Sequence, residues 1–71
     1  MKKGRVQNCI KELRQARRLS QQALGDHVGA TRQTINAIEQ GKYAPSLELA
    51  FRISAEFAVP FEDVFSFDPD G

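Results

Sequence analysis

The sequence has one cysteine, no tryptophan and no long apolar run among its 71 residues. A lone cysteine, Cys9, can neither close an internal disulfide nor build a structural zinc site. The longest unbroken apolar runs are three residues, at 49–51 and 57–59, whereas a bilayer span needs about 20. We therefore expect a protein that uses no disulfide and crosses no membrane.

An export signal is also lacking. Lys2 and Lys3 resemble the basic start of a signal peptide, but Gln7, Asn8 and Lys11 interrupt the region where an apolar segment should follow. Without such a signal, the reducing cytoplasm is the expected location of the chain and of its single thiol.

The short length predicts a single domain over residues 1–71. A chain of this size buries only about 60% of its unfolded surface, so it is marginally stable alone. Oligomerisation is a common remedy at this length. A core and a deep substrate pocket can hardly coexist in so few residues, which argues against an enzyme and leaves no cofactor to expect.

Charge is distributed unevenly along the chain. Residues 1–42 carry nine Lys and Arg against three acids, a net of +6, and residues 43–71 carry one Arg against six acids, a net of −5. A basic half beside an acidic half suggests a polyanion, such as nucleic acid, facing one side of the protein. Unevenly placed solubilising charge is the alternative.

Apolar residues at helical spacing, together with capping residues, predict short helices. The candidate N-caps Asn8, Ser20, Thr31 and Ser46 open helices over residues 8–18, 21–28, 32–40 and 47–57. Gly29 and Gly41 end the second and third of these helices. Pro60 suits the first turn of a short fifth helix.

Several apolar positions are candidates for the core. Val28, Ile35 and Ile38 would hold the second and third helices onto it. In the fourth helix the inward stripe is expected to be Leu47, Ala50, Ile53 and Phe57. The weak alternation of apolar and polar residues at 4–7 and 65–68 predicts two short strands that pair with one another.

The most informative stretch is residues 19–42, two short helices joined by a tight turn at Gly29. Ala23 is expected where the helices approach closely. The third helix would expose the polar side chains Arg32, Gln33, Asn36 and Gln40. Arg matches guanine O6 and N7, and Gln or Asn matches adenine N6 and N7. The pattern therefore favours base reading over the alternative of an ordinary solvated face.

Residues 19–50 read L-S-Q-x-x-L-x-x-x-x-G-x-x-R-Q-T-I-x-x-I-E-x-G-K-Y-x-P-S-L-x-L-A, and P-x-E-D-V-F follows at 60–65. This pattern resembles the Cro/C1-type (XRE) helix-turn-helix proteins, and within them the short stand-alone repressors. The resemblance covers residues 8 to about 66. It implies an all-α, five-helix, lambda-repressor-like domain that binds operator DNA as a dimer. In the shortest members the two termini also form a two-stranded antiparallel ribbon.

The resemblance assigns roles to individual residues. Its base-reading positions are Arg32, Gln33 and Asn36, with a phosphate as the alternative partner of Asn36. Its phosphate-contacting positions are Gln21, which also braces the recognition helix, Thr31, Thr34, Lys42 and Tyr43. Arg14 and Glu39 match a structural salt bridge, in which loss of one partner is costly.

Two positions depart from the family pattern. Ala30 stands where many relatives have Ser or Thr, with little effect expected because Thr31 can still cap. Gly25 stands where Ala is usual, and glycine inside a helix costs about 1 kcal/mol relative to Ala, so the second helix is expected to be looser.

Other polar residues do not form a catalytic or metal site. His27 stands alone and is expected on the surface, and Cys9 is expected to act as a small buried hydrophobe rather than a redox sensor. The candidate serine nucleophiles Ser20, Ser46 and Ser54 lack His and Asp partners. Glu62 and Asp63 suit the start of the fifth helix better than a cation site.

The C-terminal aromatic residues are numerous for a monomer of this size. We expect a dimer interface that includes Phe51, Phe61, Phe65 and Phe67. The alternative is that these rings belong only to the core.

These features together predict a homodimeric, cytoplasmic transcriptional regulator, a repressor, whose partner is a double-stranded DNA operator. Two copies of the third helix would enter successive major grooves about 34 Å apart, or roughly 10 base pairs, on an inverted repeat. No small-molecule ligand is evident. The alternative function is an antitoxin or another protein-binding module that acts with a partner protein.

Overall fold

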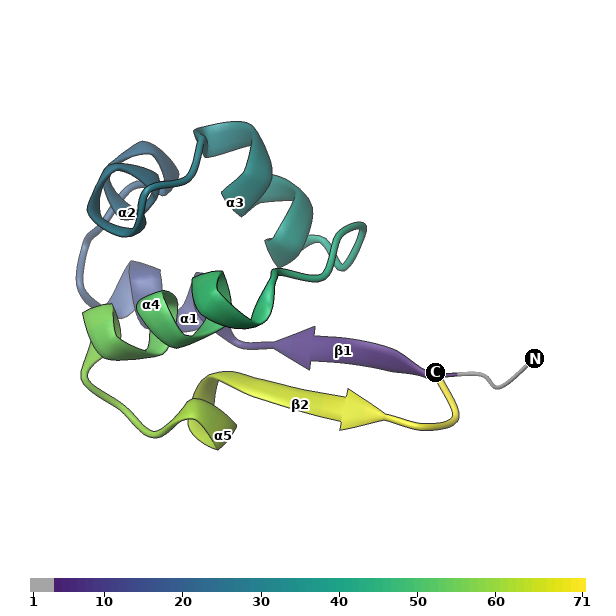
Figure 1. The fold of residues 1–71 in the computed structure, drawn as a ribbon. Helices are drawn as coiled ribbons and strands as arrows, with labels where there is room; N and C mark the ends of the chain where they lie inside the picture. Colours follow the sequence, from purple (N-terminus) through teal and green to yellow (C-terminus); the bar gives the residue numbers. More distant parts are fainter. Residues whose placement is uncertain (1–3) are drawn as a thin grey trace.

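The computed structural model describes residues 4–71, which form five helices and one two-stranded antiparallel ribbon (Figure 1). The elements are β1 (Arg5–Asn8), α1 (Ile10–Ala16), α2 (Gln21–Val28), α3 (Arg32–Glu39), α4 (Leu47–Phe57), α5 (Phe61–Val64) and β2 (Phe65–Asp68). The predicted fold, five helices with a terminal ribbon, is confirmed. Lys2 and Lys3, which we compared with the start of a signal peptide, lie outside the described residues.

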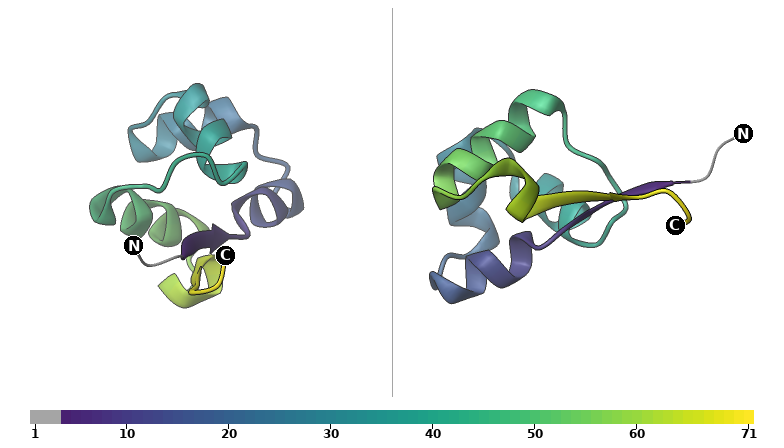
Figure 2. Two further views of the ribbon diagram at one scale, coloured as in Figure 1. Left: turned by 90° about the vertical axis from the view of Figure 1, so that its right-hand side faces the viewer. Right: turned by 90° about the horizontal axis from the view of Figure 1, so that it is seen from below.

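The ribbon joins the two ends of the described chain. β1 pairs with β2 in a register that sets Val6 opposite Phe67 and Asn8 opposite Phe65. It projects beyond the helices (Figure 2), and the molecule measures 37 × 23 × 20 Å along its principal axes. The first strand spans residues 5–8 rather than the predicted 4–7.

Side-chain caps set the starts of three helices. The hydroxyl oxygens of Ser20, Thr31 and Ser46 accept hydrogen bonds from the backbone N–H three residues on, at 3.0, 3.1 and 3.1 Å. The bounds of α2 and α4 are those predicted, and α3 ends one residue earlier, at Glu39. Gly29 and Gly41 follow their helices with φ of 78° and 74°, in the left-handed region that glycine adopts readily.

The first helix is shorter than predicted. α1 covers residues 10–16 rather than 8–18, because Asn8 belongs to β1. The Asn8 side chain connects strand and helix: its Oδ1 accepts from the Ile10 N–H at 3.1 Å, and its Nδ2 donates to the Ile38 carbonyl at 2.9 Å. Arg18 adopts a left-handed φ of 54°, which ends the helical path early.

One contiguous core holds the helices together. Its buried members are Ile10, Leu24, Val28, Ile35, Ile38, Ala50, Ile53, Phe57, Val64 and Phe65. The inward stripe predicted for α4 was wrong at Leu47, which is 68% exposed. The first turn of α4 extends past the edge of the core, so its buried stripe begins only at Ala50.

The close backbone approach near α2 occurs at Gly25. Gly25 is buried and its carbonyl accepts the Ala30 N–H at 2.9 Å, whereas Ala23, where we expected that approach, is half-buried. The absence of a side chain at Gly25 lets the turn after α2 lie against the helix. None of the helices in residues 4–71 has the length and apolar character needed to cross a bilayer.

Candidate nucleic-acid interface

α3 carries a polar face on the outside of the molecule. Ile35 and Ile38 are buried on its inner side, while Arg32 and Gln33 are exposed and Asn36 is partly exposed. α2 and α3 lie together on one side of the molecule, and the ribbon and α5 lie on the opposite side (Figures 1 and 2). The three side chains expected to read bases are thus on a single accessible helix face.

Two threonines organise the start of α3. Thr31 Oγ1 accepts the Thr34 backbone N–H at 3.1 Å, and the two hydroxyl oxygens lie 3.0 Å apart. Thr31 therefore serves as the N-cap. Both hydroxyls sit at the positive end of the helix, where a phosphate group is favoured.

A nearly buried ion pair fixes α3 to α1. Arg14 Nε donates to Glu39 Oε2 at 2.7 Å, and Arg14 Nη2 donates to Oε1 at 3.1 Å. A third bond runs from Arg14 Nη1 to the Leu19 carbonyl at 3.0 Å. The side chains are 12% and 4% exposed. Hydrogen bonding to Glu39 raises the pKa of Arg14, although burial acts in the opposite direction.

Amide side chains connect this ion pair to the exposed face. Gln21 Nε2 donates to Glu39 Oε1 and to Asn36 Oδ1, both at 3.1 Å. Gln40 Nε2 donates to the same Asn36 oxygen at 3.2 Å. Gln21, the first residue of α2, thus contacts α3 at two positions, and the side chain of Asn36 is held by two donors.

The loop after α3 presents two further candidate contacts. The Lys42 backbone N–H donates to the Ala37 carbonyl at 2.9 Å, which ties the loop to the end of the helix. The Lys42 side chain is exposed and Tyr43 is 51% exposed. Both side chains are therefore accessible, in the loop that directly follows α3.

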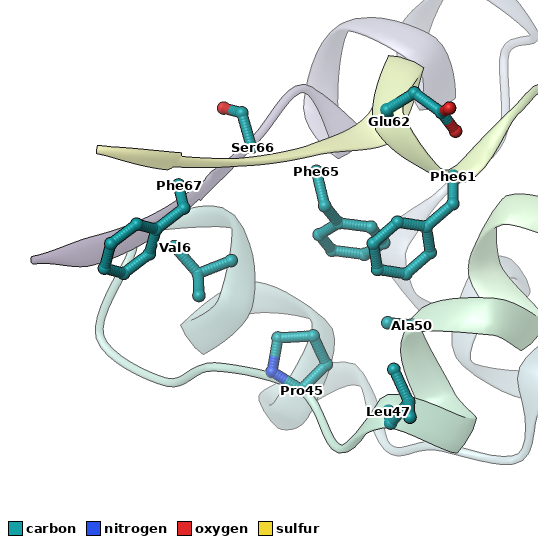
Figure 3. Close-up of a pocket in the computed structure, with 9 residues that line it drawn as sticks. All are labelled: Val6, Pro45, Leu47, Ala50, Phe61, Glu62, Phe65, Ser66 and Phe67. Atoms are coloured by element: carbon teal, nitrogen blue, oxygen red, sulfur yellow. The ribbon is translucent and has the colours of Figure 1, made fainter. Parts of the chain in front are cut away.

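An apolar groove lies at the other end of the molecule, between the ribbon, α5 and the start of α4 (Figure 3). It has a volume of about 460 Å³. Its apolar lining comprises Val6, Pro45, Leu47, Ala50, Phe61, Phe65 and Phe67. The Glu62 and Ser66 side chains point away from it (Figure 3).

The candidate interface aromatics divide between surface and core. Phe51 and Phe67 are 54% and 62% exposed, and Phe61 is half-buried. Phe65 is only 5% exposed and belongs to the core, while its ring also forms part of the groove wall. The ring centroid of Phe61 lies 5.0 Å from that of Phe51 and 5.1 Å from that of Phe65, which makes one continuous aromatic cluster.

Sequence reasoning did not single out Val6, Pro45 or Leu47 as part of this apolar surface. Val6 stands between polar neighbours in a predicted strand, so the alternation marks a face without saying what that face covers. Leu47 was assigned to the core stripe, and only the position of the α4 start shows that it lies outside the core.

The remaining polar candidates have hydrogen-bond or ion-pair partners within the fold. Ser54 Oγ donates to the Ala50 carbonyl at 3.1 Å, and His27 Nδ1 lies 2.7 Å from Glu56 Oε2. Cys9 is half-buried and its thiol donates to the Asp63 carbonyl at 2.9 Å. Across residues 4–71, no three His, Cys, Asp or Glu side chains are grouped so as to hold a metal ion.

The fold and the polar face agree with a family match. A family model described as helix-turn-helix matches residues 10–64, most of the chain. The chain belongs to this helix-turn-helix family, and the resemblance to the Cro/C1-type (XRE) proteins is confirmed.

Relatives from a bacterium and an archaeon are similar over nearly their whole length. The HTH-type transcriptional regulator YgzD of Bacillus subtilis is 52% identical over 60 residues, which cover 84% of this chain and 91% of YgzD. The HTH-type transcriptional regulator MJ0272 of Methanocaldococcus jannaschii is 46% identical over 65 residues, covering 92% of this chain and 98% of that protein. These relatives support a DNA-binding regulator.

A solved structure supports the fold independently. The crystal structure of a proposed DNA-binding protein from Bacteroides fragilis superposes with a TM-score of 0.77 and covers 86% of this chain and 98% of its own. At 20% sequence identity this likeness concerns the fold alone.

Proposed function

We propose that this protein is a cytoplasmic, sequence-specific transcriptional repressor that binds an inverted-repeat operator as a homodimer. The observation that carries the proposal is the exposed polar face of α3, held in place by the nearly buried pair of Arg14 and Glu39. A helix of this kind fits the major groove of B-DNA, where base pairs differ in their hydrogen-bonding groups.

In this proposal the contacts divide into two kinds. Arg32, Gln33 and Asn36 read base edges and supply sequence preference. Contacts to phosphate groups come from Gln21, Thr31, Thr34, Lys42 and Tyr43, and supply salt-dependent affinity. Both sets belong to the side of the molecule that carries α2, α3 and the following loop.

The apolar groove supports the proposed dimer. Phe51, Phe67 and Leu47, in or beside the groove, are each more than half exposed. Contiguous exposed apolar surface of this kind marks an interaction site in a soluble protein. A second copy would present the same groove, as a two-fold interface requires.

Selection of bound sequences from a pool of random duplexes tests DNA reading. We expect enrichment of one inverted repeat whose half-sites lie about 34 Å apart, roughly 10 base pairs. No enrichment over scrambled competitor, even at low ionic strength, would overturn the proposal. A reporter whose promoter overlaps the selected operator tests the direction of regulation, and expression should fall when the protein is present.

Sedimentation velocity tests the dimer. Phe67→Asp introduces a charge into the apolar groove and should shift the protein towards monomer, whereas Gln15→Glu adds a charge at an exposed position of α1 and should leave the dimer intact. A wild-type protein that sediments as a monomer at micromolar concentration would contradict the homodimer.

A further inference from the structure

Three amide side chains beside the polar face of α3, those of Gln21, Asn36 and Gln40, are linked by hydrogen bonds with a fixed order of donor and acceptor. Both Gln21 Nε2 contacts run outward from that nitrogen, to Glu39 Oε1 and Asn36 Oδ1 at 3.1 Å each. The second donor to Asn36 Oδ1 is Gln40 Nε2, at 3.2 Å. The two side-chain N–H groups of Gln21 and the side-chain oxygen of Asn36 are therefore engaged within the protein, so a phosphate contact by Gln21 would come from its backbone N–H at the first position of α2.

Glu39 sets this direction. An ionised carboxylate can only accept hydrogen bonds. The Glu39 side chain is 4% exposed and is held by two bonds from Arg14, so it cannot turn away. If the Gln21 amide were reversed, its oxygen would lie against the carboxylate, so two acceptors would face one another in a largely buried site, and Glu39 Oε1 would keep only its bond from Arg14.

The orientation of Gln21 then sets the orientation of Asn36. With its nitrogen fixed towards Glu39, Gln21 has one remaining N–H, which needs an oxygen as its partner. Asn36 supplies Oδ1, and no hydrogen bond among residues 4–71 engages its Nδ2. Asn36 therefore offers two N–H donors to its surroundings while its acceptor is already occupied.

We infer that Asn36 acts as a donor only, and reads acceptors alone, guanine N7 and O6 or thymine O4. Adenine is disfavoured because beside its N7 acceptor it presents an N6 donor, which an amide without a free oxygen cannot accept. Gln21 is the positioning residue that transmits the direction from Glu39. The inference rests on the proposed function and names the base chemistry of that same site. An unconstrained Asn pairs with adenine by accepting from N6 and donating to N7, which requires the oxygen that Asn36 has already used.

The experiment begins with the selected operator. Selection is repeated with Asn36→Ala, and the base pair whose preference disappears is the one that Asn36 reads. If the wild type selects an operator and no base pair depends on Asn36, the inference is overturned while the proposed function stands. If the wild type selects no sequence, both fail together.

Base analogues then identify the atom that Asn36 contacts. Removing the acceptor that Asn36 contacts at that pair, whether a purine N7, guanine O6 or thymine O4, should weaken binding of the wild type about fivefold or more and leave Asn36→Ala unaffected. Duplexes lacking an amino group, adenine N6 or cytosine N4, should weaken both proteins equally. A loss of the amino group that selectively weakens the wild type would show that Asn36 accepts, and would overturn the inference.

Two matched variants test the role of Glu39. Gln21→Ala and Gln40→Ala each remove one donor to Asn36, but only Gln21 connects Asn36 to Glu39. Gln21→Ala should free the Asn36 amide to turn, so that the base preference at that pair falls towards equality. Gln40→Ala should keep the preference. Thermal melts confirm that both variants fold, and an unchanged preference in Gln21→Ala would overturn the positioning role.

Discussion

The Cα of Gly25 faces the backbone of Ala30 so closely that a Cβ added at Gly25 would lie 2.6 Å from the Ala30 carbonyl oxygen. Ala30 belongs to the turn that leads directly into α3, and its backbone N–H donates to the Gly25 carbonyl at 2.9 Å. The glycine thus sets how closely the turn approaches α2, and through it where α3 begins.

Gly25→Ala should therefore destabilise the protein although alanine is the better helix former. The higher helix propensity of alanine stabilises the folded state by about 1 kcal/mol, while forcing a methyl group into a packed site destabilises it by about 1–3 kcal/mol. We expect the unfolding free energy to fall by up to about 2 kcal/mol in urea titrations. A rise in stability would show that the turn moves to accommodate the methyl group.

The pair of Arg14 and Glu39 makes a second prediction for stability. Glu39→Ala leaves the Arg14 charge unpaired at a site only 12% exposed, and should lower the unfolding free energy by about 3–5 kcal/mol. The double variant Arg14→Met with Glu39→Leu leaves no buried charge and should recover most of that loss. If the double variant is as unstable as Glu39→Ala, the penalty does not come from an unpaired charge.

Arg32 lies exposed at the first position of α3. In the proposed complex its guanidinium pairs with guanine O6 and N7. Arg32→Ala should remove about 1–3 kcal/mol of discrimination at one base pair, measured by comparing the selected operator with single-base variants. An equal loss of affinity for every sequence would instead make Arg32 a phosphate contact.

Lys42 is exposed in the loop after α3 and should contact the DNA backbone. Lys42→Ala should weaken binding to all sequences similarly and lower the salt slope of log affinity by about 1. Arg52→Ala removes a cation from α4 that is bonded to Glu48, and should leave the slope unchanged. A sequence-dependent loss in Lys42→Ala would contradict the backbone role.

Ala58 ends α4 in a left-handed conformation, with φ of 57°. The left-handed conformation costs a non-glycine residue about 1–2 kcal/mol. Glycine avoids this cost but destabilises the folded state by about 0.5–1 kcal/mol, because it loses more chain entropy on folding. Ala58→Gly should thus raise the unfolding free energy by about 0.5–1 kcal/mol. Ala55→Gly, inside the same helix, should lower it by a similar amount. Equal signs for the two variants would refute the argument.

Much of the helical framework could be predicted because local chemistry determines it. Ser20, Thr31 and Ser46 each bond to a backbone N–H only three residues away, so the sequence near each one contains the whole interaction. Asn8 differs, since its side chain also bonds to Ile38, which lies 30 residues further along the chain. That contact, and the strand pairing beside it, depends on tertiary structure.

The candidate site was predictable where helix periodicity determines it, but not where it depends on tertiary contacts. Periodicity placed Arg32 and Gln33 on the exposed face of α3, because Ile35 and Ile38 had to face inwards. The direction of the amide bonds between Gln21 and Asn36 was not predictable, since it follows from side-chain orientation around a buried carboxylate. The burial of Phe65 was not predicted for a related reason. Phe61, Phe65 and Phe67 lie close together in the sequence, and only the packing of the fold decides which ring enters the core.

The ribbon has a consequence for protein synthesis. β1 is translated well before β2, so Val6 has no opposite strand until residues 65–68 have been translated. A nascent chain can already form α2 and α3 while it lacks the wall of the groove that Phe65 and Phe67 provide. Any assembly that uses this groove is thus deferred until residues 65–68 have been translated, and products truncated before them are left unable to take part in it.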